Sequence, residues 1–320
     1  MSVGVSQSHA VADGQSLWNF MVSWGECARG HADITVPPIH ERERLALQGP
    51  PSEEKAKKLV ERVFWRSPEE EEEEEEKDHH REEEEKEEEV AKDGAAPQVV
   101  LTQCVFDVSA SSIKKLKAEA GGSFTTYEVV CAHFWQRVNV ARQSPPKTKI
   151  RFAVLTNLRT KLTPPLPASY FGNVIGFGLA DTRAGTLRGE DLATIAARIH
   201  GAALDGGNPE CLFESMHWLD LHGNRFVELW QGWFGLEQMN VASSPRFPAY
   251  KVDFGWGFPA AVRSSKVPGD GEMVLFGGRP GSGEGDMEIC MALPSPVMKR
   301  LLDDPSFLAK PISSPFHYYD

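Results

Sequence analysis

Apolar residues repeat at helical and strand spacings along most of this chain. After Asp13 they recur every third or fourth position and predict a helix that ends near Arg29. Asp13 is its expected N-cap residue, and Gly30 is its expected stop. Residues 3–11, which precede this helix, predict a short strand and its exit. A strand-to-helix junction is therefore expected close to residue 13.

The remainder of the chain shows both periodicities. Strands are predicted at residues 99–108, 150–157, 170–177, 250–256, 272–276 and 286–293. Helices are predicted at residues 109–119, 124–142, 192–204, 209–230 and 295–303. Strands and helices mix without regular alternation, and no internal repeat is visible. The expected fold class is therefore α/β with mixed sheets.

The net charge of −12 is confined to one segment. Residues 69–92 contain 16 acidic and four basic residues, so the rest of the chain is electrically balanced. Such a run is typical of a solvated loop held open by its own repulsion, which we favour. The alternative is an acidic tract that binds a basic partner such as a histone. We expect a Glu-rich insert or linker at residues 66–97, between one domain at residues 1–65 and another at residues 98–320.

Composition also argues against several classes of protein. The five cysteines are scattered and include no C-x-x-C pair, which argues against a disulfide framework or a zinc site. No apolar run approaches the roughly 20 residues of a membrane span, and no signal peptide is visible. No basic stripe for nucleic acid and no Gly-rich phosphate loop is present. We therefore expect a soluble cytoplasmic protein.

A short H-x-x-x-D-G pattern, from His9 to Asp13 and Gly14, lies at the predicted strand-to-helix junction. Such a short pattern also occurs by chance, as a loop histidine beside an ordinary aspartate N-cap. The junction favours a functional role, because side chains there face a cleft. An imidazole pKa of about 6.5 suits a general base near neutral pH.

A second pattern, Asp253-Phe254-Gly255-Trp256-Gly257, is too specific to be accidental. Its residue types favour a structural role over a chemical one. The two glycines permit close backbone approach, and the tryptophan is expected to fill a core.

Together, and in this order, the two patterns resemble the signatures of the BAHD family of plant acyl-CoA-dependent acyltransferases. Residues 170–174 (Tyr-Phe-Gly-Asn-Val), 157–162 and 243–248 resemble further segments of that family. The resemblance runs from Val3 to about Leu308 and is interrupted mainly by the Glu-rich insert. It implies a two-domain fold of the chloramphenicol acetyltransferase type, with a channel that acyl-CoA and the acceptor enter from opposite faces.

The resemblance also implies roles for single residues. His9 is the expected general base, and Asp13 points away from the channel and orients its loop through an arginine, for which Arg159 is the candidate. Asp253 to Gly257 are expected to hold the second domain together. Arg246 either meets an acidic acceptor or is a surface arginine; the chain lacks the tryptophan that many members carry two positions earlier, so both remain open.

For ligands, the resemblance implies acyl-CoA as co-substrate and a small-molecule alcohol or amine as acceptor. It implies no bound cofactor, no metal and a monomer. The segment 243–248 resembles a branch of the family that includes cuticle-associated enzymes, so the expected setting is plant specialised or cuticle metabolism.

The family carries a long segment before its histidine, whereas Met1 falls inside the expected strand. The first domain is therefore expected to be incomplete, with poor solubility and little catalysis. Two alternatives follow: a catalytically inactive fragment with a binding or regulatory role, and an acidic interaction protein that acts through residues 69–92.

Overall fold

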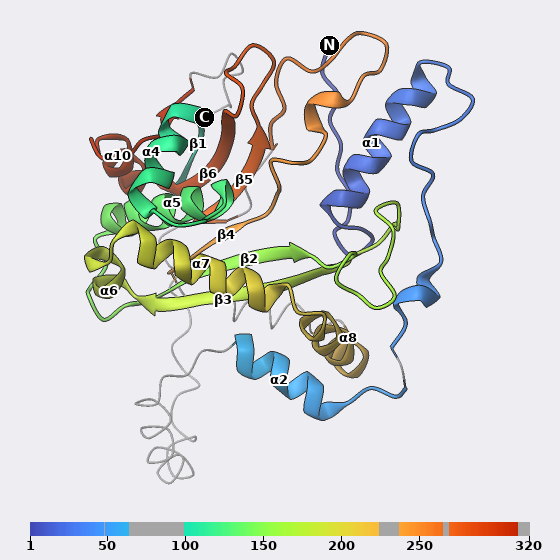
Figure 1. Ribbon diagram of the computed structural model, residues 1–320, viewed down its shortest axis with the longest axis horizontal. Coiled ribbons are helices and arrows are strands. Elements are labelled where there is room, and N and C mark those ends of the chain that lie inside the picture. Colours follow the sequence, from blue (N-terminus) through green and yellow to red (C-terminus); the bar gives the residue numbers. More distant parts are fainter. Residues whose placement is uncertain (48, 64–98, 224–236, 265–268, 313–320) are drawn as a thin grey trace, which may run out of the picture.

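The computed structural model describes residues 1–47, 49–63, 99–223, 237–264 and 269–312 (Figure 1). Its helices are α1 (Gly14–Ala28), α2 (Glu53–Val63), α4 (Ala110–Ala120), α5 (Thr126–Arg142), α6 (Ala184–Gly189), α7 (Leu192–Gly206), α8 (Glu210–His222) and α10 (Ser295–Leu302), with short 3-10 helices η1 (Arg42–Leu45) and η3 (Ala249–Lys251). Its strands are β1 (Leu101–Val108), β2 (Lys149–Asn157), β3 (Ile175–Arg183), β4 (Glu237–Val241), β5 (Glu272–Gly277), β6 (Met287–Pro294) and β7 (Lys310–Pro311).

The described strands form one sheet in the order β3-β2-β4-β5-β6-β1-β7. The pairs β2–β4 and β4–β5 are parallel and the others antiparallel, so the predicted mixed sheet is confirmed. Helices α4, α5, α7 and α10 gather on one side of the sheet (Figure 1), and their apolar side chains form one buried core with the strands. Strand β6 is typical, because Met287, Ile289 and Met291 alternate toward that core.

Helix α2 packs against α8 beside β3 (Figure 1), with Leu59 and Trp218 in a small cluster of their own. Helix α2 was not predicted from the sequence, because seven of its 11 residues are charged. Its buried residues Ala56, Leu59 and Val63 nevertheless repeat at intervals of three and four. None of the described helices is long and apolar enough to cross a membrane.

Three predicted extended segments differ in the structure. Residues 3–11 form no strand. A strand needs a neighbouring strand to satisfy its backbone hydrogen bonds, and none of the described strands pairs with this segment. Residues 170–174 form a loop, and the strand β3 begins only at Ile175. Residues 250–256 begin in η3 and continue as bends, because Gly255 adopts a left-handed φ of 99°.

Other predictions fall partly outside the described residues. Helix α8 ends at His222, with Gly223 as its C-cap, and the rest of the predicted 209–230 helix is not among the described residues. The Glu-rich insert at residues 66–97 also lies outside them.

A buried histidine of the core, His133, has a lowered pKa. His133 of α5 is buried, its ring is stacked on Phe307 with centroids 5.7 Å apart, and its Nε2 accepts a hydrogen bond from the Leu308 N–H at 3.1 Å. Burial lowers the pKa of His133 to about 4. The unfolded chain therefore takes up this proton at a higher pH than the folded chain does.

We expect acid to destabilise the fold through His133. The contribution of His133 to the free energy of unfolding is fully present above its ordinary pKa of about 6.5. It falls by about 3 kcal/mol as the pH drops to 4, because in that window the proton binds mainly to the unfolded state. Urea unfolding at a series of pH values measures the slope. The variant His133→Gln, whose amide oxygen can still accept from Leu308, should show a flatter profile, and an unchanged slope would exclude this residue as the cause.

Candidate active site

A cavity of about 310 Å³ lies where the ends of three strands meet the beginning of α1. It is bordered by His9 from the segment before α1, by Tyr127 from α5 and by Arg246 from the loop after β4. Apolar residues from the strands complete the wall, among them Leu155 and Ile175. A concave space with apolar walls and a few convergent polar groups is typical of a small-molecule site.

His9 is solvent-exposed and lies in a turn, in which the Val11 N–H bonds to the Ser8 carbonyl at 3.1 Å. The carbonyl oxygen of His9 accepts a hydrogen bond from Asn173 Nδ2 at 2.7 Å. The turn is therefore attached to the 170–174 loop through its backbone, which leaves the imidazole beside the cavity.

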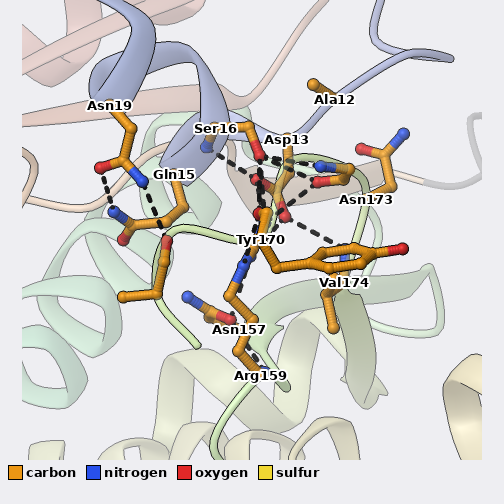
Figure 2. A network of polar contacts seen from close by, with 12 residues as sticks. Ala12, Asp13, Gln15, Ser16, Asn19, Asn157, Arg159, Tyr170, Asn173 and Val174 are labelled. Carbon is orange, nitrogen blue, oxygen red and sulfur yellow. Dashed lines mark hydrogen bonds and ion pairs between the residues drawn. The ribbon is translucent and has the colours of Figure 1, made fainter. Parts of the chain in front are cut away.

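Asp13 begins α1 and is almost fully buried, with 2% of its surface exposed. One carboxylate oxygen, Oδ1, accepts from the Ser16 N–H at 3.0 Å, and Oδ2 accepts from the Val174 N–H at 3.1 Å. Arg159, which is 1% exposed, donates to both oxygens at 2.7 and 3.0 Å (Figure 2). The predicted pairing of Asp13 with Arg159 is therefore formed, with two-point geometry.

Arg159, which follows β2, joins the 170–174 loop to the start of α1, which is distant in sequence. Its Nη2 donates to the carbonyl oxygens of Tyr170 at 3.0 Å and Gly172 at 3.1 Å, and to Ser16 Oγ at 3.1 Å. Ser16 Oγ in turn accepts from the Gly172 N–H at 3.1 Å, so α1, the end of β2 and the 170–174 loop share one buried network (Figure 2). A buried charge pair is stable only when its remaining donors and acceptors are satisfied, as they are here.

The five-residue motif at 253–257 lies against the other end of α1. The carboxylate of Asp253 accepts from the N–H groups of Gly255 at 2.7 Å and Gly257 at 3.0 Å, and the first of these bonds contributes most to lowering the pKa of Asp253. Its backbone carbonyl accepts from Arg29 at the end of α1. The Phe254 ring meets Trp24 edge to face, with centroids 5.1 Å apart.

The prediction that Trp256 fills a core is wrong, because this side chain is 62% exposed. Gly255 and Gly257 both have positive φ angles and wrap the chain around the Asp253 carboxylate, which turns the tryptophan outward. Among the described residues that line the cavity, none comes from this motif.

Arg246 is exposed in a turn, and its backbone N–H bonds to Ser244 Oγ at 3.3 Å. Arg246 lines the cavity and forms no ion pair with an acidic side chain in the described ranges. The next residue, Phe247, approaches the start of α1 so closely that a Cβ at Gly14 would lie 2.9 Å from its ring. The structure therefore brings His9, Asp13 and Arg246 around one cavity.

Two residues of the site, Tyr127 and Asn157, were not predicted from the sequence. Nothing in the sequence indicated that Tyr127 borders a site, because its position continues the apolar face of the predicted helix 124–142. Asn157 lay in a segment that resembled the family, but no role was inferred for it; its Oδ1 accepts from the Arg159 N–H at 3.0 Å. Among the described residues no cluster of three metal-ligating side chains occurs.

Comparison with known proteins gives relatives along almost the whole chain. A hydroxycinnamoyltransferase from Narcissus pseudonarcissus is 29% identical over 297 residues, which are 91% of this chain and 63% of the relative. The BAHD acyltransferase DCR of Arabidopsis thaliana is 29% identical over 330 residues, 96% of this chain and 60% of the relative. The chain thus spans about three-fifths of the length of these relatives.

A solved structure of F. graminearum TRI101, complexed with coenzyme A and deoxynivalenol, matches with a TM-score of 0.67 at 16% identity, over 94% of this chain and 65% of that one. A likeness at this identity concerns the fold alone, and it confirms the expected acyltransferase-type α/β fold. The sequence profile of the Transferase family matches residues 1–308. The chain therefore belongs to the Transferase family, to which its BAHD acyltransferase relatives also belong.

Proposed function

We propose that this chain transfers an acyl group from a CoA thioester to a hydroxyl or amine group of a small acceptor, with His9 as general base. The observation that supports this most directly is the exposed imidazole beside a cavity, next to a buried network that fixes the start of α1. His9 takes the acceptor proton as the acceptor oxygen or nitrogen attacks the thioester carbonyl. The tetrahedral intermediate then expels CoA as thiolate, which recovers the proton from His9.

In this proposal neither Asp13 nor Arg159 transfers a proton. Both side chains are buried and bonded to each other, so they act by holding the turn that carries His9. The motif at 253–257 serves to fasten the C-terminal part of the chain to α1. The division into domains at residues 1–65 and 98–320, joined by the Glu-rich insert, is part of the same proposal.

For the acyl donor we propose a hydroxycinnamoyl-CoA, since the Narcissus relative is named a hydroxycinnamoyltransferase. The test is to incubate the chain with p-coumaroyl-CoA and shikimate, a hydroxylated acid, and to follow the ester by chromatography. Product formation supports the proposal. A chain that binds neither CoA nor p-coumaroyl-CoA would favour the catalytically inactive fragment with a binding or regulatory role.

Arg246 is proposed to bind the carboxylate of an acidic acceptor. We expect Arg246→Gln to raise KM for shikimate about 10- to 100-fold, because a charge-assisted hydrogen bond is lost. The variant Arg246→Lys keeps the charge and should lose less. Steady-state kinetics with shikimate and with its uncharged methyl ester separate the effects, since KM for the ester should not change; equal losses for both acceptors would contradict a carboxylate contact.

A further inference from the structure

Tyr127 occupies a fixed place at the beginning of α5. A capping box closes this end of the helix: Thr125 Oγ1 accepts from the Glu128 N–H at 3.3 Å, and Glu128 Oε2 accepts from the Thr125 N–H at 2.6 Å. Tyr127 both packs against the main core and borders the cavity. Its position is therefore set by the helix and not by a mobile loop.

The hydroxyl group of Tyr127 is poorly satisfied within the described residues. Its oxygen is buried without a well-aligned hydrogen-bond partner among them, and its nearest polar contact is the thiol of Cys131, a weak partner one helical turn away. Burial raises the pKa of this hydroxyl well above its usual range, so the group stays neutral and keeps its proton to donate. A buried polar group without a partner costs stability, and a phenylalanine would fill the same space without that cost.

We propose that Tyr127 is a substrate-binding residue whose hydroxyl donates a hydrogen bond to an uncharged oxygen of a molecule held in the cavity. This inference rests on the proposed function and deepens it. Two residues of the cavity lining then take different polar groups of the ligand: cationic Arg246 takes a carboxylate, and neutral Tyr127 takes a carbonyl or hydroxyl oxygen. The lining also includes apolar strand residues, among them Val241, which suit an aromatic or alkenyl group.

The uncharged oxygen belongs either to the acyl donor or to the acceptor, and Tyr127→Phe distinguishes them. We expect the affinity for p-coumaroyl-CoA, measured by calorimetry without acceptor, to fall about tenfold if the donor carries the oxygen. If the acceptor carries it, donor affinity stays unchanged and KM for shikimate rises about tenfold. In either case the ligand-free variant should unfold at the same temperature as the parent or at a higher one.

Tyr250→Phe is the matched control. The Tyr250 hydroxyl is bonded to buried Glu288 at 2.6 Å and does not border the cavity. Removal of this hydroxyl should lower the unfolding temperature and leave the affinity for p-coumaroyl-CoA and the KM for shikimate unchanged. This pattern is the opposite of the one expected for Tyr127→Phe.

Two results would overturn the assignment of Tyr127. One is unchanged donor affinity together with unchanged acceptor KM in Tyr127→Phe. The other is a lower unfolding temperature of the ligand-free variant, which would make the hydroxyl a structural partner of Cys131. A parent chain that binds no CoA thioester refutes the proposed function and this inference with it, whereas normal binding by the parent and an unaffected variant refute this inference alone.

Discussion

Replacing Arg159 by methionine is expected to destabilise the chain by about 3–5 kcal/mol, because the change leaves the Asp13 carboxylate buried without its counter-charge. The same substitution removes donors from the carbonyls of Tyr170 and Gly172 and from Ser16. Urea unfolding at pH 7 measures the loss as a shift in midpoint at constant slope.

Two further variants make this test specific. Lys57→Met removes an exposed ion pair with Glu61 and should leave the midpoint unchanged. The double variant Asp13→Asn, Arg159→Met should be more stable than Arg159→Met alone, because no unpaired charge remains buried. A single Arg159→Met variant that unfolds with the parent would show that the pair contributes nothing to the fold.

Local sequence signals predicted the described helices except α2 and α6. Asp13, Ser109 and Thr125 stand before apolar periodic segments, and each accepts a backbone N–H of the helix that follows it. Strand predictions were less accurate, because a strand depends on a partner that periodicity does not reveal. Residues 3–11 have the apolar content of a strand but no described partner, whereas β4 was not predicted and pairs on both sides.

The candidate site was predictable only where the family resemblance supplied it. His9, Asp13 and Arg246 came from short patterns, and the structure places them around one cavity. The contact between Asp13 and Arg159 spans 146 positions, so no local rule of spacing could give it. Tyr127 escaped prediction for a different reason, because a tyrosine on the apolar face of a helix is indistinguishable in sequence from a core residue. The chemical roles of these residues remain predictions.

His9→Ala is expected to lower kcat about 10²- to 10⁴-fold, the contribution typical of a positioned general base. The loss should appear in kcat and not in the affinity for p-coumaroyl-CoA, because the imidazole acts on the acceptor proton. Stability should change little: His9 is exposed, and its bond to Asn173 uses the backbone carbonyl, which alanine retains. Single-turnover transfer to shikimate, measured beside calorimetric binding, separates these effects.

The control for this change is His31→Ala, since His31 is also exposed but follows the far end of α1 and does not border the cavity. It should transfer acyl groups at the parental rate. If His9→Ala keeps the parental rate as well, another group must take the acceptor proton, and the exposed imidazole would be incidental to the cavity. If both variants lose activity together with thermal stability, the effect lies in the packing of α1, and the buried network around Asp13 would be the feature that limits catalysis.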